Sequence, residues 1–285
     1  MKSHAALSQA CFFWLFRASA CAAIGLLILV LTLLILAGHQ VIDWHFLTAS
    51  WKHQDITEGG IFPAILGSVY LGLGVMFVSF PFGVATAVFL TEYGRHSRAR
   101  RLIQLAIRNL AGVPSVVYGL FGLAVFVHLF GFGMSLFSAV LTLSVMTLPW
   151  VITSSVEALE AVPQQFRDSS LALGATKWQT IRHIVLPAAL PGCLTGGVIG
   201  MARALGETAP IILVGATFFL TRLPSSPFDK YMALPYHVFI LATQHASPYA
   251  QQFAAGSALV LMAVTFLLSL GAIILRYRFR SKKVW

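Results

Sequence analysis

Long stretches without a charged residue are the feature that most limits how this chain can fold. Residues 18–42 contain no Asp, Glu, Lys or Arg, and residues 109–156 remain uncharged over 48 positions. Of the 285 residues, 58% are apolar and only 10% are charged, whereas a soluble domain carries about 25% charged residues. Because so few charges cannot cover a core with polar surface, we expect the surface to face lipid.

The apolar stretches predict an all-α, polytopic membrane protein with six transmembrane helices, since each span needs about 20 mostly apolar residues. The first stretch is far longer than the apolar region of a secretory signal, so we expect it to be retained as a span. The uncharged run at 109–156 is long enough for two spans that turn near residues 131–133. The expected spans are residues 18–38, 61–90, two within 109–156, 190–215 and 254–275.

The basic residues are distributed unevenly between the two sides that these spans define. Only Lys52, Arg222 and Lys230 fall on one side, and Arg203 lies within a span. The other fifteen are Lys2, Arg17, Arg95, Arg98, Arg100, Arg101, Arg108, Arg167, Lys177, Arg182, Arg276, Arg278, Arg280, Lys282 and Lys283. Because loops rich in Lys and Arg stay in the cytoplasm, we expect both termini to be cytoplasmic. The bacterial inner membrane is the expected location, and this loop charge accounts for the net charge of +10 without nucleic acid.

We expect three regions along the chain. Residues 1–60 hold a cytoplasmic segment, the first span and an outer loop. Residues 61–275 form the transmembrane domain, and residues 276–285 form a basic cytoplasmic tail. On the outer side, the proline-rich residues 216–253 are expected to form a lid or docking surface.

The largest cytoplasmic loop is residues 157–187, where apolar and polar residues alternate with helix-like spacing. Gly174 breaks the pattern in the middle and Pro187 ends it. This predicts two short amphipathic helices joined at a glycine turn, presenting a surface to a soluble partner. The alternative is a helix pair that lies on the lipid headgroups.

No catalytic signature is present in the sequence. It has no G-x-x-x-x-G-K-[ST] for ATP, no H-E-x-x-H for zinc and no G-x-S-x-G for a nucleophilic serine. The three cysteines show no metal or disulfide spacing. We therefore expect a protein that is not an enzyme and binds no cofactor itself. If ATP drives it, another chain must bind the nucleotide.

Arg203 and Glu207 are the strongest chemical signal, because both lie in the fifth expected span. A charge at the bilayer centre costs about 2.5–3.5 kcal/mol on insertion scales and tends to mark function. The planar guanidinium of Arg203 suits an oxyanion. Glu207, one turn away, can weaken the binding of that anion to Arg203. Thr208 can add a hydroxyl, and Pro210 is expected to interrupt the helix. The alternative is an ion pair that only fixes helix packing, and spacing alone leaves both open.

A second polar position lies at the start of the expected third span. Asn109 and Ser115 flank a Gly-Val-Pro sequence, which predicts a bent or locally unwound helix. Both side chains are candidates for lining a pathway. Close packing of small residues is the competing interpretation.

The 157–187 loop resembles the signature of ABC-importer permeases, in which an E-A-A triplet, three residues, Gly, nine residues and I-x-L-P follow one another. Here Gly174 is followed by nine residues and Ile184-Val185-Leu186-Pro187, while the triplet reads Asp168-Ser169-Ser170. In that family the loop docks on the ATPase and the glycine makes its turn. The resemblance implies coupling roles for Asp168, Ala172, Leu173, Gly174, Ala175, Ile184, Leu186 and Pro187.

Three further motifs resemble phosphate-specific ABC permeases: residues 59–65 (GGIFPAI), 112–120 (GVPSVVYGL) and 202–210 (ARALGETAP). The stretch from Leu234-Pro235 to Ser247-Pro248 resembles the A-type subunit. The resemblance implies the type I importer permease fold, in which this chain forms half of the translocation pathway. It also implies a C-type permease partner, two ATPase subunits holding ATP and Mg²⁺, and an extracytoplasmic phosphate-binding protein.

Two other functions remain open at this point. A permease for sulfate, molybdate or phosphonate would also suit an arginine in the span. A secondary transporter or channel would need no ATPase, but its inverted repeats are not visible as two matching halves.

Overall fold

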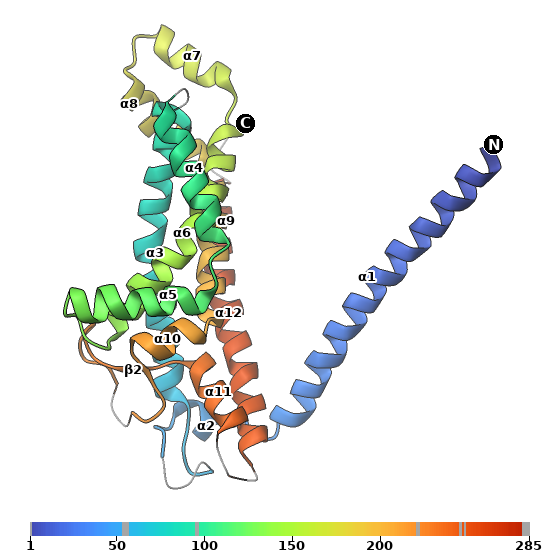
Figure 1. Cartoon of the computed structure of the whole chain (residues 1–285), viewed down its shortest axis with the longest axis vertical. Coiled ribbons are helices and arrows are strands. Elements are labelled where there is room, and N and C mark those ends of the chain that lie inside the picture. Colours follow the sequence, from blue (N-terminus) through green and yellow to red (C-terminus); the bar gives the residue numbers. More distant parts are fainter. Residues whose placement is uncertain are drawn as a thin grey trace.

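The computed structural model describes residues 2–52, 57–94, 97–220, 223–244, 247 and 249–280. Arg95, Arg222, Pro248, Lys282 and Lys283, which entered the sequence predictions, lie outside these residues. The described chain is an elongated helical bundle with short helices at both ends (Figure 1). We name these ends after α7 and α11, the helices that mark them.

Five helices of the described chain are long and apolar enough to cross a membrane, and a sixth span is present if a bent pair is counted. The protein is therefore a multi-pass membrane protein, as the apolar stretches predict. The five contain α1 (Lys2–Gly38), α3 (Phe62–Val88) with its π-helical end η1 (Phe89–Tyr93), α6 (Leu136–Glu160), α9 (Leu186–Gly206) and α12 (Ala250–Arg280).

Helices α3, α6 and α9 pack along their lengths and hold the centre of the bundle. Small residues make this packing close, since glycines repeat every fourth residue on the face of α9 that meets α6. A Cβ added at Gly196 would lie 2.6 Å from the Cβ of Ser154. Close backbone approach of this kind holds helices together in lipid, where burial of apolar surface between helices provides little driving force.

Helix α1 leaves the bundle and contacts it near its C-terminal end (Figure 1). There Gly38 lies against the backbone of α12, and a Cβ would come within 2.7 Å of Ala255 and Gly256. None of the most apolar part of α1 is buried in the isolated chain. Its side chains are therefore available to lipid or to another subunit.

The third expected span is a broken helix. α4 (Arg98–Ala111) and α5 (Ser115–Gly122) with its π-helical end η2 (Leu123–Leu129) meet at 105°. The bend predicted at the Gly-Val-Pro motif is confirmed, because Pro114 donates no hydrogen bond and disfavours helix at the preceding residue.

The expected start of the third span at residue 109 is wrong, since Asn109 lies near the end of α4 and the bent pair begins at Arg98. α5 and η2 together reach about 22 Å at 1.5 Å per residue, too short to cross a core of about 30 Å. They lie across the bundle axis while α4 runs along it (Figure 1). The predicted turn at 131–133 is confirmed, with Gly131 and Gly133 at φ of 69° and 67°.

The fifth span also differs from its expected bounds. A continuous helix runs from Lys177 to Gly206, through α8 (Lys177–Thr180), η3 (Ile181–Val185) and α9. The expected stop at Pro187 is wrong, because Leu186 bonds back to Ile181 in a widened π-type turn that the proline can follow.

The break at the other end of α9 comes before the proline that was expected to cause it. Glu207 is already extended, at φ −80° and ψ 129°. Pro210 stands in the first turn of α10 (Ala209–Val214), where a missing N–H is tolerated. The span therefore ends at residue 206 rather than at 215.

The described residues of the 216–253 segment pack against the rest of the bundle. β1 (Ala216–Thr217) pairs in parallel with β2 (Tyr231–Met232), and α11 (Leu234–Thr243) follows. The Leu234 N–H donates to Ser68 Oγ of α3 at 2.8 Å. The short α2 (Trp44–Thr48) packs beside α11 at the same end. A docking role for this end stays a prediction.

A turn stabilised by Asp229 caps the start of α6. Its Oδ2 accepts hydrogen bonds from the Ser225 hydroxyl at 2.8 Å and from the Ser225 and Ser226 N–H groups at 2.9 Å. These bonds, the hydroxyl first, lower the pKa of Asp229, so the carboxylate stays charged at neutral pH. The Asp229 carbonyl in turn accepts from the Leu136 N–H at 2.9 Å.

The glycine contact between α9 and α6 yields a stability prediction. Gly196→Leu overpacks the interface and should destabilise the protein by about 1–3 kcal/mol, seen as a lower melting temperature in detergent. Gly25→Leu is the control, because nothing lies within 4 Å of a Cβ there. Equal melting temperatures for the two variants would contradict the assigned α6–α9 packing.

Candidate functional site

Arg203 lies in the last turn of α9, next to the break before α10. Its Cζ is 5.3 Å from the ring centroid of Trp150. Trp150 is the fifteenth of the 25 residues of α6, so the guanidinium lies near the middle of that helix. Its depth in the membrane stays a prediction.

Glu207 accompanies Arg203 at the break. Their Nη2 and Oε1 atoms are 3.5 Å apart, and the side chains are 44% and 17% exposed in the isolated chain. The pair lies within one segment, so it does not tie two helices together. Among the described residues no other hydrogen bond or ion pair engages this guanidinium. A half-exposed arginine of this kind keeps N–H donors available to an anion.

The two broken helices meet beside Arg203. A Cβ on Gly119 of α5 would lie 2.8 Å from Pro210 Cα of α10, so these helices cross in contact. Tyr118 Oη donates to the Leu110 carbonyl at 2.8 Å and closes the α4–α5 bend. The motifs at 112–120 and 202–210 therefore build one site.

The remaining predicted pathway residues surround these breaks. Thr208 precedes α10 and is half-buried, Ser115 begins α5 and is half-buried, and Asn109 is exposed on α4. In the described chain, no hydrogen bond joins Asn109 or Ser115 to Arg203 or Glu207. The structure thus groups Arg203, Glu207 and Thr208, and leaves the other two at the neighbouring bend. The described ranges contain no group of three or more His, Cys, Asp or Glu residues placed for a metal ion.

The second candidate region is the far tip of the molecule, formed by α7 (Gln164–Ala172) and α8 (Figure 1). Gly174 joins them at φ 84°, a left-handed conformation that side chains rarely adopt. The Ala175 N–H donates to the Ser170 carbonyl at 3.2 Å, which caps α7. The prediction of two helices joined at a glycine turn is confirmed.

The tip exposes apolar side chains. Leu173 is 90% exposed and Trp178 is 55% exposed. Large apolar side chains gathered on a surface mark a site that binds a protein or a membrane. Asp168 is exposed as well and accepts a hydrogen bond from Gln164 Nε2 at 3.0 Å. The predicted coupling residues Asp168, Ala172, Leu173, Gly174 and Ala175 all belong to this tip.

The other three predicted coupling residues lie elsewhere. Ile184 belongs to η3, and Leu186 and Pro187 begin α9. They connect the tip to the span, because α8 continues into the membrane helix instead of ending before it. They therefore lie at the base of the α7–α8 tip rather than on its exposed surface.

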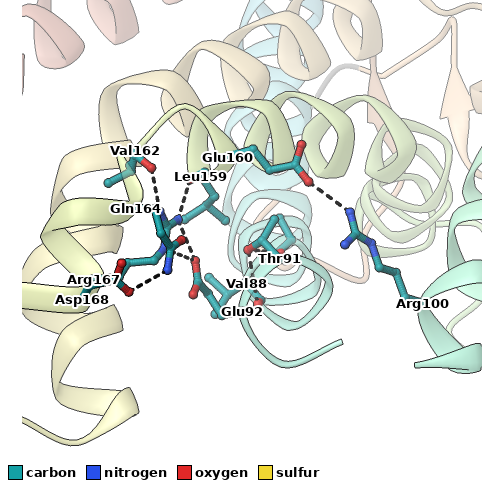
Figure 2. A network of polar contacts seen from close by, with 11 residues as sticks. Val88, Thr91, Glu92, Arg100, Leu159, Glu160, Val162, Gln164, Arg167 and Asp168 are labelled. Carbon is teal, nitrogen blue, oxygen red and sulfur yellow. Dashed lines mark hydrogen bonds and ion pairs between the residues drawn. The ribbon is translucent and has the colours of Figure 1, made fainter. Parts of the chain in front are cut away.

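Sequence reasoning missed the buried ion pair that attaches α7 to the bundle (Figure 2). Arg167 is 5% exposed and is the one Asp, Glu, Lys or Arg residue that is buried in the described chain. Its Nη2 and Nε donate to Glu92 Oε1 at 2.8 and 3.1 Å. Its Nη1 and Nη2 also donate to the carbonyls of Val162 at 2.6 Å and Leu159 at 2.8 Å. The partners are 75 residues apart in the sequence, which offers no signal for the pairing.

Comparison with known proteins gives the following matches. The family described as "Binding-protein-dependent transport system inner membrane component" matches residues 79–283. The Probable ABC transporter permease protein YqgI of Bacillus subtilis is 31% identical over 88% of this chain and 90% of that protein. The Phosphate transport system permease protein PstA 1 of Mycobacterium tuberculosis is 34% identical over 82% of this chain and 79% of that protein.

Solved structures show the same fold. A bacterial alginate ABC transporter, in complex with an alginate pentasaccharide-bound periplasmic protein, aligns with a TM-score of 0.67. The alignment has 19% identity and covers 95% of this chain and 96% of that one. The inward-facing MetNI methionine ABC transporter aligns with a TM-score of 0.61 and 17% identity, over 77% and 94% of the two chains.

The contact between Arg203 and Trp150 can be tested chemically. Trp150→Leu removes the aromatic face that covers the guanidinium, so an arginine-specific dicarbonyl should modify Arg203 faster by about 2- to 5-fold, as expected for a contact of about 0.5–1 kcal/mol. Trp150→Phe keeps an aromatic face and is the matched control. Equal modification of Arg203 in both variants, measured by mass spectrometry, would contradict the contact.

Proposed function

Because this chain belongs to the family of inner membrane components of binding-protein-dependent transport systems, we propose that it is the A-type permease subunit of an ATP-driven phosphate importer. Phosphate is taken from the similarity to phosphate transport permeases and from the chemistry of Arg203. The chain itself provides half of the pathway and no ATP site.

The placement of Arg203 carries this proposal. A guanidinium near the middle of the bundle offers two parallel N–H donors that match phosphate oxygens. Glu207, 3.5 Å away, competes for the same donors. Its carboxylate limits how tightly an anion is held and provides a partner for Arg203 after the anion leaves. Thr208 at the same break adds a hydroxyl, and Ser115 and Asn109 extend the polar lining.

The other half of the pathway belongs, in this proposal, to a C-type permease subunit. Arg203 is 44% exposed in the isolated chain, and the broken helices α4 and α5 also expose apolar side chains. These include Leu102 and Leu105 of α4 and Val117 and Leu120 of α5, which are between 47% and 69% exposed. An apolar face beside a half-exposed arginine suits a second membrane subunit better than lipid.

In this proposal two ATPase subunits bind ATP and Mg²⁺ and drive transport. One of them docks on the α7–α8 tip. The exposed Leu173 and Trp178 provide apolar contact there, and Asp168 provides charge. The alternative, that this tip lies on lipid headgroups, is disfavoured because the tip projects beyond the bundle along its axis (Figure 1).

We place the α7 end in the cytoplasm of a bacterium, with the chain in the inner membrane. The basic residues of α4, α7 and α8 support this orientation. The α11 end then faces outward, where an extracytoplasmic phosphate-binding protein delivers its ligand.

The main test is Arg203→Ala in the assembled complex. Loss of a charged hydrogen-bonding group costs about 1.5–3 kcal/mol, so phosphate uptake should fall by about 10-fold or more. Uptake of labelled phosphate is measured in proteoliposomes, with assembly checked by co-purification. Arg203→Lys keeps the positive charge but loses the two parallel N–H donors of the guanidinium, so its uptake rate should lie between those of the wild type and Arg203→Ala. Normal uptake by a properly inserted Arg203→Ala protein would contradict the proposal that Arg203 binds the anion.

The choice of anion has its own measurement. Unlabelled phosphate should compete fully with labelled phosphate uptake, while sulfate, molybdate and phosphonate should compete weakly. Stronger competition by one of these three would reassign the cargo. Transport by this chain alone in liposomes, without an ATPase, would instead indicate a secondary transporter or channel.

The coupling tip is tested at Gly174. A β-branched residue at φ 84° costs about 1–2 kcal/mol in this turn, so Gly174→Val should reshape the docking surface and lower transport per ATP hydrolysed. Gly174→Asn is the control, because asparagine tolerates this conformation and nothing lies within 4 Å of an added Cβ. Equal coupling in both variants would contradict the role of the turn.

A further inference from the structure

We propose that the Arg167–Glu92 ion pair is the joint through which movement of α7 is transmitted to α3 and α6 during transport. This rests on the proposed function, in which an ATPase pushes on α7. Arg167 is then a positioning residue that acts at a distance from the cargo. Figure 2 shows that its side chain lies between three elements: α7 itself, the end of α6 and the end of α3.

The geometry uses the guanidinium as a rigid three-way connector. One edge, Nε and Nη2, donates to a single carboxylate oxygen of Glu92. The remaining donors reach the carbonyls of Leu159 and Val162, at the C-terminal end of α6. The Leu159 carbonyl also accepts from the Val162 N–H at 3.3 Å, and Val162 lies just beyond the last residue of α6. Arg167 therefore adds two hydrogen bonds to the backbone at the point where the chain leaves α6.

Charge makes this connection hard to break. Glu92 lies at the end of the α3 helix, where the helix dipole disfavours a carboxylate. Its side chain is 9% exposed, and that of Arg167 is 6% exposed. A buried charge left without its partner is strongly unfavourable, so α7 cannot move away from α3 without a large penalty. The three elements are therefore expected to move together.

A second set of contacts makes the tip one unit. Ser170 of α7 and Thr180 of α8 share a buried hydrogen bond of 2.9 Å. Lys177 of α8 lies 4.8 Å from the ring centroid of Tyr93, the residue that follows Glu92. Force on the tip therefore enters α3 at two adjacent positions.

From this joint, packed helices lead to Arg203. Leu159 lies nine residues beyond Trp150 on α6, and Trp150 contacts Arg203. α3 and α6 also meet closely beside Trp150, since a Cβ on Gly83 would lie 2.5 Å from Val151 Cγ1. A displacement of α7 thus reaches the helix that covers the candidate anion site without passing through a flexible loop.

The experiment separates transmission from simple anchoring. Arg167→Lys keeps the charge but cannot reach Glu92 and both carbonyls at once, and Glu92→Gln keeps the shape but loses the charge. In proteoliposomes with the whole complex, labelled phosphate uptake and ATP hydrolysis are measured together. We expect phosphate carried per ATP to fall about fivefold or more in both variants, while assembly changes less than about twofold.

Arg100→Lys is the matched control. Arg100 makes an ion pair with Glu160 at 3.0 Å at the same end of the bundle, but its partner is 47% exposed (Figure 2). An exposed pair contributes little, so this variant should keep the wild-type ratio of phosphate to ATP.

Two results would contradict the proposed transmission through Arg167 and Glu92, and a third would contradict the proposed function on which it rests. A wild-type ratio in Arg167→Lys and Glu92→Gln would overturn transmission. Loss of assembly in both variants would also overturn it, because the pair would then be a structural anchor. If the wild-type complex carries no phosphate, the proposed function fails instead, and the ratio is measured with the oxyanion that it does carry.

Discussion

Backbone groups freed where a helix breaks cannot be left facing lipid, which offers no hydrogen bonds. In the described residues such breaks lie between α4 and α5 and between α9 and α10, and the helices α5 and α10 that follow them pack against each other. Tyr118 Oη satisfies the Leu110 carbonyl at the first break. At the far end of α10, the Ser135 N–H satisfies the carbonyl of Val214. The helices that follow the two breaks, α5 and α10, meet at Gly119 and Pro210, and Arg203 lies in the last helical turn before the second break.

α6 connects the two functional regions. Its middle covers Arg203 through Trp150, and its end holds the buried side chain of Arg167. Because α9 packs on α6 through a stripe of glycines, neither helix can shift far without moving the other. The candidate anion site at the middle of α6 and the α7–α8 tip beyond its end are thus attached to one packed unit (Figure 1).

Much of the fold could be predicted because its signals are local. Uncharged stretches located the spans, and the glycine at 174 located the turn between α7 and α8. The Gly-Val-Pro motif located the bend after α4. Errors arose where a local rule met a longer-range effect. Pro187 would normally stop a helix, but the widened turn at η3 carries the helix through it. The proline-rich composition of 216–253 also gave no sign that Tyr231, Met232 and Leu234 are buried against α3.

The sequence by itself determined the membrane class of this protein, the polar positions at Arg203 and Glu207, and the glycine turn between α7 and α8. Each depends on composition or on residues close together in the chain. Only the tertiary structure decided that α5 crosses the bundle axis, that Trp150 covers Arg203, and that Arg167 meets Glu92 75 residues away. Those contacts depend on which helix faces come together, and that choice is made by packing and by the need to pair every buried charge, which no local pattern records.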